Sequence, residues 1–176
     1  TGNLNFDFNS ENYKMSDSYS EDIREGNNKI FNLFANKSDF ILCGSADVSS
    51  STKLLINKEG LMSDRNPLNR NIAFGVREHA MAAIANGISL SNIKVFISTY
   101  LAFADYLKPA MRMSALMNLP VTYVFTHDSV KIGYDGPTHE PIEQLSSLRL
   151  IPNLITIRPA DINEVLGTYE YISKHN

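Results

Sequence analysis

Apolar residues along the chain form short runs separated by longer amphipathic stretches. Five runs are rich in β-branched and aromatic side chains and predict buried strands, at residues 40–43, 71–74, 95–97, 121–125 and 154–157. Helical segments of roughly 10 to 15 residues lie between them. This alternation predicts an α/β fold, in which a doubly wound, mainly parallel sheet is covered by helices on both faces.

The predicted helices differ in composition. The first begins near Arg24, and an alanine-rich helix covers residues 78–89. A third covers residues 106–117, with Pro109 within its first turn. The last begins at Asp161, where Asp-Ile-Asn-Glu has the spacing of a capping box. No strand follows this helix, so we expect the fold to lack its last strand.

The chain divides into a polar start and one domain. Residues 1–20 are rich in Asn, Ser and Asp without an apolar period, which predicts a flexible linker or tail. Residues 21–176 are expected to form a single domain, because a chain of 176 residues with 43% hydrophobic content fills one core and not two. The chain starts without Met and stops on a helix, so we expect a fragment of a longer protein.

Composition removes several classes of partner. A net charge of −3 and an isoelectric point near 5.8 provide no basic surface for nucleic acid or an anionic membrane. Cys43 is the only cysteine, which excludes an internal disulfide. The sequence has no run long enough to span a bilayer and no signal peptide. We therefore expect a cytoplasmic protein.

Polar residues gather in the loop 126–141, directly after the apolar run 121–125. Open parallel sheets place their ligands at the carboxyl ends of the strands. His127, Asp135 and His139 have the donors and acceptors to hold a polyhydroxylated or phosphorylated substrate. The alternative is a loop stabilised by its own Asx and Ser turns.

Glu78 stands at the start of the alanine-rich helix, in Gly75-Val-Arg-Glu-His79. Burial there favours the neutral carboxyl, whereas the helix N-terminus favours the carboxylate. Opposing effects of this kind suit proton transfer. The alternative is a solvated helix start, with both Arg77 and Glu78 at the surface.

Three aromatic residues, Tyr100, Phe103 and Tyr106, recur at every third position. This spacing places them on one helical face or on an irregular helix entry. Such a stripe usually packs into a core. The two hydroxyls need partners when buried, and a planar heterocycle would satisfy both rings and hydroxyls.

Three further polar residues lie near predicted element ends. Asp47 and Ser51 follow the run 40–43, where they either serve a ligand or cap the next element. Arg24 opens the first helix and either holds a phosphate or is an ordinary surface residue.

Several of these motifs resemble one family. Its pyrimidine-binding domain has, in the same order and spacing, Gly75-Val-Arg-Glu-His79, Tyr100-Leu-Ala-Phe103-Ala-Asp-Tyr106, Thr126-His-Asp-Ser129, Asp135-Gly-Pro-Thr-His-Glu-Pro-Ile-Glu143 and Arg158-Pro-Ala-Asp161. From about residue 22 to its end, the chain resembles the transketolases. The related synthases that make deoxyxylulose phosphate differ at the Arg-Glu-His and Thr-His-Asp-Ser blocks.

The resemblance implies a role for each candidate residue. Glu78 matches the Glu that binds the aminopyrimidine ring of thiamine diphosphate and assists its activation, and Asp47 matches an acidic residue near the cofactor and the dimer contact. The pocket around the ring matches Tyr100, Phe103 and Tyr106. Substrate-side positions match His127, Asp135 and His139, with His139 near the reacting carbonyl, and the sugar phosphate positions match Arg24 and Ser51.

The resemblance also implies an activity that this segment cannot perform alone. Transketolases transfer a two-carbon ketol unit between sugar phosphates of the pentose phosphate pathway. Their active site forms in a homodimer, and a separate domain with a Gly-Asp-Gly motif holds the diphosphate and its Mg (or Ca). That motif is missing from this sequence, so the segment is expected to be inactive and to bind no metal.

Two positions depart from the sequence pattern of the family, and two other classes of function stay open. Tyr134 replaces an acidic residue before Asp-Gly-Pro, and Val48-Ser-Ser-Ser51 replaces a common Leu-Thr-Pro-Ser run. A hydrolase or metal site can be drawn from His127, Asp128, Ser129 and His139, although neither metal-ligand spacing nor a nucleophile elbow supports it. A noncatalytic binding or assembly module is the other class.

Overall fold

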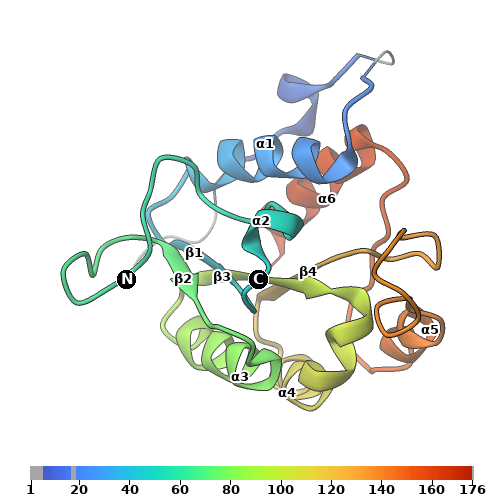
Figure 1. Ribbon diagram of the computed structural model, residues 1–176. Helices are drawn as coiled ribbons and strands as arrows, with labels where there is room; N and C mark the ends of the chain where they lie inside the picture. Colours follow the sequence, from blue (N-terminus) through green and yellow to red (C-terminus); the bar gives the residue numbers. More distant parts are fainter. Residues whose placement is uncertain (1–5, 17–18, 176) are drawn as a thin grey trace.

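The fold is a sheet between two layers of helices (Figure 1). The computed structural model describes residues 6–16 and 19–175. Its four strands are all parallel and stand in the order β2-β1-β3-β4. Their bounds are β1 Ile41–Ser45, β2 Asn71–Ala73, β3 Lys94–Tyr100 and β4 Val121–Thr126. The predicted α/β class and parallel sheet are confirmed.

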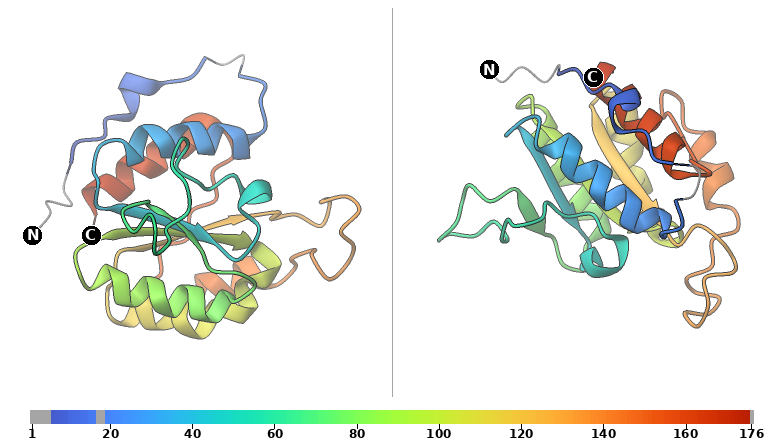
Figure 2. Two further views of the ribbon diagram at one scale, coloured as in Figure 1. Left: turned by 60° about the vertical axis from the view of Figure 1, so that its left-hand side comes forward. Right: turned by 90° about the horizontal axis from the view of Figure 1, so that it is seen from above.

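Each face of the sheet carries two long helices (Figure 2). One face is covered by α1 (Ile23–Ala35) and α6 (Ile162–Lys174), and the other by α3 (Glu78–Ser89) and α4 (Ala104–Leu116). The short helices are α2 (Ser49–Thr52) and α5 (Gln144–Arg149), and the 3-10 turns are η1 (Ser10–Tyr13) and η2 (Leu101–Phe103). The helix predicted at residues 78–89 has these bounds in the structure.

The sheet separates two hydrophobic cores, and β3 contributes to both. Phe96 packs with Phe31 and Phe34 of α1, whereas its neighbours Val95 and Ile97 pack on the side of α3 and α4. All five are essentially buried. Successive strand residues point to opposite faces, so a continuous apolar run is what a strand covered on both faces requires.

Gly44 lets β1 approach its neighbours closely. A Cβ at this position would lie 2.4 Å from the Phe74 ring and 2.5 Å from the Ile72 carbonyl oxygen. These distances are too short for any side chain, so only glycine fits here.

The prediction of a strand at residues 154–157 is wrong, because this segment pairs with no strand among the described residues. A cleft of about 820 Å³ is lined both by β4 and by Leu154, Ile155, Thr156 and Ile157. The apolar run lacks a paired neighbour, and Ile155 and Ile157 are exposed as a result. The β-branched composition of this segment predicts burial, whereas the described residues leave Ile155 and Ile157 exposed.

The third predicted helix begins earlier than expected. It starts at Ala104 after the 3-10 turn η2, so Pro109 is its sixth residue and the prediction of a first-turn position is wrong. Proline has no N–H to donate to the carbonyl of Asp105, which leaves one gap in the hydrogen-bond ladder.

The predicted linker is partly packed on the domain. Phe8 is fully buried, and its ring stacks on Tyr13 at 5.1 Å and meets Phe34 edge-on at 5.3 Å. Ser10 donates hydrogen bonds to the Glu170 carboxylate of α6. Phe8 therefore belongs to the core around α1 and α6, and Phe6, Tyr13 and Met15 pack against that core. Residues 1–5 and 17–18 of the predicted linker lie outside the described residues.

Candidate functional site

Apart from Arg24, which lies in the first turn of α1, the predicted site residues lie at or after the carboxyl ends of the four strands. Parallel strands end at one edge of a sheet, so the loops after them meet there. Asp47 follows β1, Glu78 follows β2, Tyr100 ends β3 and His127 follows β4. This edge also receives the long loop after β4 that carries Asp135 and His139.

Tyr100 is the centre of an aromatic cluster. Its ring stacks on His127, with 3.8 Å between centroids, and lies 5.8 Å from Phe103. His139 meets Phe103 edge-to-face at 5.0 Å and lies 5.9 Å from Tyr100. Tyr106 follows Phe103 at 6.0 Å and is 65% exposed. The three aromatic residues therefore form one surface, but not on one helix, because Tyr100 belongs to β3.

Each histidine is oriented by the threonine before it. A hydrogen bond of 2.9 Å joins Thr126 Oγ1 to His127 Nδ1, and one of 2.8 Å joins Thr138 Oγ1 to His139 Nδ1. Because Nδ1 is engaged, Nε2 is the nitrogen left to meet a substrate.

The surroundings of His127 disfavour its charged form. Burial is the main cause that lowers the pKa of His127, and the positive charge of Arg24 lowers it further. Asp135 and Asp22 act in the opposite direction. His127 is therefore expected to be neutral at pH 7, with one nitrogen able to donate and the other able to accept.

Arg24 is held in one orientation. Asp22 caps α1, because its carboxylate accepts a hydrogen bond from the backbone N–H of Arg24 at 2.7 Å. The same carboxylate accepts from the Arg24 side chain, from Nη2 at 2.9 Å and from Nε at 3.2 Å. On its other side, Arg24 Nη1 donates to the Ser51 carbonyl at 3.1 Å. The structure thus joins Arg24 to the Ser51 loop through the backbone, and not through the Ser51 hydroxyl.

Glu78 is the buried first residue of α3, with 9% of its surface exposed. Gly75 precedes it in a left-handed conformation, at φ +66°, and Arg77 turns back to donate to the Phe74 carbonyl at 3.0 Å. Among the described residues, no side chain or N–H group donates a hydrogen bond to the Glu78 carboxylate. The predicted alternative of a solvated Glu78 is wrong, because the fold buries this side chain.

Asp47 and Asp135 are both exposed. Asp47 has a left-handed backbone, at φ 66°, directly after β1. Asp135 acts on His127 through its charge. Within the described parts of the chain, no hydrogen bond or ion pair joins Glu78 or Asp47 to the aromatic cluster.

Three residues at this edge were missed from the sequence. Asp22 holds Arg24, and its position two residues before an arginine at a helix start is an N-cap signal that could have identified it. Asp105 and Gln144 are joined by a hydrogen bond of 2.7 Å across 39 residues of sequence. No local pattern predicts such a pair.

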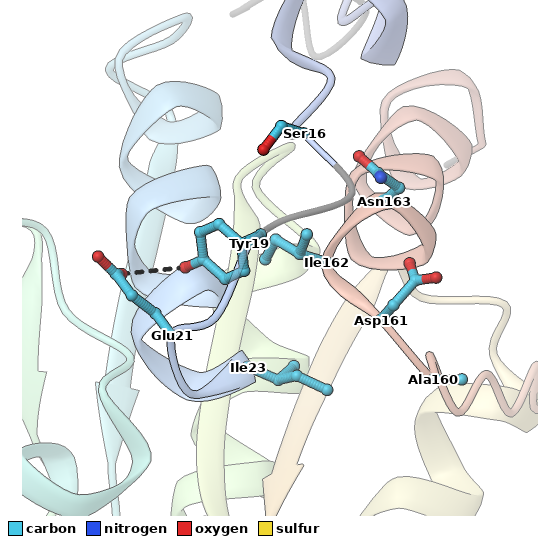
Figure 3. A pocket seen from close by; sticks show the side chains of 8 residues that line it. All are labelled: Ser16, Tyr19, Glu21, Ile23, Ala160, Asp161, Ile162 and Asn163. Atoms are coloured by element: carbon cyan, nitrogen blue, oxygen red, sulfur yellow. Dashed lines mark hydrogen bonds between the residues drawn. The ribbon is translucent and has the colours of Figure 1, made fainter.

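A second, smaller pocket of about 310 Å³ lies between the N-terminal segment and the start of α6 (Figure 3). Its wall includes Tyr19, which donates a hydrogen bond to Glu21 at 3.1 Å, and Asp161 and Asn163 of α6. It contains none of the predicted site residues.

Residues 6–16 and 19–175 contain neither a cluster of metal ligands nor a membrane-spanning helix. No three His, Cys, Asp or Glu side chains stand together in a way that could hold a metal ion. No helix in the same residues combines the length and apolar character needed to cross a membrane.

Comparison with known proteins gives a consistent family. Residues 20–176 match the family model described as the transketolase pyrimidine-binding domain. A probable transketolase of Streptococcus pneumoniae is 49% identical over 88% of this chain and 24% of its own length. A transketolase of Bacillus subtilis is 49% identical over 84% of this chain and 22% of its own length.

Solved structures agree with the sequences. A Pichia stipitis transketolase, described as a complex with sedoheptulose 7-phosphate, superposes with a TM-score of 0.87 at 36% identity. The match covers 90% of this chain and 25% of that one. The chain therefore spans about a quarter of the length of the relatives it matches. Because the family model covers nearly all of it, the chain belongs to the transketolase pyrimidine-binding domain family.

Proposed function

We propose that this chain is the pyrimidine-binding part of a transketolase that uses thiamine diphosphate to move a two-carbon ketol unit from a ketose phosphate to an aldose phosphate, in the pentose phosphate pathway. The observation that carries the proposal is the Glu78 side chain, which is 9% exposed at the ligand-binding edge and whose carboxylate accepts no hydrogen bond from the described residues. The second support is that the chain belongs to the transketolase pyrimidine-binding domain family.

The residues present fit the aminopyrimidine ring of thiamine diphosphate. A carboxylate on a largely buried side chain is stabilised by a hydrogen-bond donor, and a nitrogen heterocycle that binds a proton supplies one. Phe103 and its neighbours Tyr100 and Tyr106 offer ring faces for a planar heterocycle. When bound, the cofactor supplies carbanion chemistry, while Glu78 holds and shares the proton at the ring nitrogen.

The remaining site residues are proposed to receive the sugar phosphate. His139 hydrogen-bonds near the reacting carbonyl, and Asp135 recognises a hydroxyl group. Arg24 and His127 face the phosphate, with Ser51 beside them, since Arg24 keeps N–H groups beyond those used by Asp22 and the Ser51 carbonyl. Asp47 lies near the cofactor and the contact between subunits.

The complete protein is proposed to be a cytoplasmic homodimer, with the cofactor between subunits and its Mg (or Ca) held by another domain. The relatives are about four times as long as the match, which supports a further domain outside this chain. This segment alone is proposed to be inactive.

The cleft beside β4 supports a further strand in that complete protein. Lys94 Nζ donates to the carbonyls of Ile172 and His175, at 3.2 and 3.4 Å, and so holds the end of α6 beside the start of β3. A segment after α6 would enter the cleft parallel to β4 and pair with its open edge.

The proposal is tested by assaying ketol transfer from a ketose phosphate to an aldose phosphate with the complete protein. We expect transfer that requires added thiamine diphosphate and a divalent cation, and none with the 176-residue chain alone. Chelator-sensitive hydrolysis of phosphate esters by this chain, without thiamine diphosphate, would support the metal hydrolase class instead.

A further inference from the structure

Gln144 is a buried polar side chain with both ends of its amide bonded. It is 6% exposed and is the first residue of α5. Its Nε2 donates to Asp105 Oδ2 at 2.7 Å, and its Oε1 accepts from the Ile142 N–H at 2.9 Å. A buried amide left without partners is costly, so this pair of bonds fixes where the end of the loop after β4 sits on α4.

The hydrogen bond between Gln144 and Asp105, called the bridge below, lies close in sequence to the contact between His139 and Phe103. Asp105 follows Phe103 by two residues, and Gln144 follows His139 by five. Pro141 lies between His139 and Gln144 in the sequence. It is buried and has a fixed φ, which stiffens the chain between these two residues. The bridge therefore closes a ring of contacts whose other side is the edge-to-face contact of His139 with Phe103, at 5.0 Å.

Other anchors of this loop are few. Among the described residues, side-chain hydrogen bonds tie residues 127–144 to distant parts of the chain at two places. One is the exposed pair of Arg158 with Asp128 at the start of the loop, and the other is Gln144 with Asp105 at its end. Between them, Gly133 and Gly136 have positive φ and open space around them. The position of His139 therefore depends on the buried anchor that lies closer to it.

We propose that Gln144, acting through Asp105, is the positioning residue for His139. It holds the imidazole against Phe103 and so sets where Nε2 meets the substrate. The catalytic consequence rests on the proposed function, but the arrangement itself is a property of this chain.

The geometry allows a rescue experiment. Gln144→Glu brings a carboxylate against Asp105, so the bond is lost and two like charges face each other. Asp105→Asn alone keeps an acceptor for Gln144 and is expected to be mild. The double variant restores the bond in the opposite sense, because the new amide at position 105 donates to the new carboxylate at position 144, while Ile142 still has its acceptor. Glu143→Gln is the matched control, since it changes one charge at the neighbouring exposed position.

Two measurements on the 176-residue chain report the position of His139. The NMR shift of its Cε1–H reflects the rings of Phe103 and Tyr100, and a His139→Asn variant assigns the signal. Trypsin cleavage after Lys131 reports opening of the loop. For Gln144→Glu we expect the shift to move toward that of a free imidazole and cleavage to accelerate about tenfold. The double variant should return both to their original values.

The proposal is wrong if Gln144→Glu leaves the His139 shift and the cleavage rate unchanged, or if the double variant stays as displaced as the single one. Should Gln144→Glu fail to fold, Asp105→Ala removes the same bond from its exposed partner and must give the same displacement. In the complete protein, Gln144→Glu should lower kcat and leave thiamine diphosphate affinity unchanged. If the unsubstituted complete protein shows no ketol transfer, the proposed function is wrong, whereas the NMR result on the position of His139 still holds.

Discussion

At the scale of single residues, the site depends on side chains whose partners are fixed before any ligand arrives. Asp22 and the Ser51 carbonyl orient Arg24, and Thr126 and Thr138 engage the Nδ1 atoms of the two histidines. Preorganised groups of this kind lose little freedom when a ligand binds. Glu78 differs from them because its side chain is largely buried and its carboxylate accepts no hydrogen bond from the described residues.

Phe103 is expected to carry cofactor affinity. In the complete protein, Phe103→Ala should weaken thiamine diphosphate binding about tenfold, because a stacked aromatic ring contributes on the order of 1 kcal/mol beyond its buried area. Isothermal titration measures this directly. Tyr134→Ala is the control, since Tyr134 is fully exposed in the loop after β4. Unchanged affinity in Phe103→Ala would count against the aromatic pocket.

His127 is expected to titrate below its ordinary pKa of about 6.5. A His whose folded pKa is lowered favours the folded state above its unfolded pKa, and this stability is lost as the pH falls through the folded pKa. NMR titration of the Cε1–H should give a midpoint under about 6.5, and Arg24→Gln should raise that midpoint without restoring it fully, because burial persists. A midpoint at or above the ordinary value would contradict this account.

At the scale of elements, a helix start with a capping motif was easier to predict than the start of α4, which follows the 3-10 turn η2. Asp161 and Glu164 were expected to open the last helix, and the Asp161 carboxylate does accept from the Glu164 N–H at 2.9 Å. Glu164 closes the motif on the Ala160 N–H at 2.6 Å, one residue earlier than in a standard capping box.

Asp161→Ala is therefore expected to lower the free energy of unfolding by about 1 kcal/mol, the usual cost of losing an N-cap. Urea denaturation followed by circular dichroism measures the change. Asp161→Asn should be close to neutral, because asparagine caps as well as aspartate. Equal losses in both variants would show that charge matters here and capping does not.

The strands show where sequence patterns reach their limit. Runs at 95–97 and 121–125 were identified because both faces of the sheet are covered, which leaves continuous apolar sequence. The run at 154–157 has the same composition, yet pairing depends on a neighbour that local pattern does not show. Gln144 and Asp105 were missed for the same reason, since their contact exists only once α4 and α5 meet.

At the scale of the whole molecule, the edge of the sheet formed by β4 is open. Residues 121–125 of β4 are only partly buried, whereas β3 is buried along nearly its whole length. The cleft beside β4 is bordered by Leu154 and by Ile172 of α6, so it is apolar on two sides. An open apolar edge of this kind is a place where another strand adds.

Hydrogen exchange tests whether the complete protein closes this edge. Every second amide of β4 points away from β3 in a parallel ladder and should exchange rapidly in the 176-residue chain. The same amides should be protected at least about tenfold more in the complete protein, if a strand after α6 fills the cleft. The amides of β1 serve as the internal control, because β2 and β3 flank that strand. Equal exchange of the β4 amides in both proteins would contradict a further strand.

The central claim is that Glu78 supports ketol transfer through the aminopyrimidine ring, and a kcat measurement at saturating thiamine diphosphate tests it most directly. Glu78→Gln keeps the size of the side chain and removes its proton chemistry, so kcat in the complete protein should fall by about 10² to 10⁴. Glu143→Gln, at an exposed position, should keep the original rate. A Glu78→Gln enzyme as fast as the original would contradict the account.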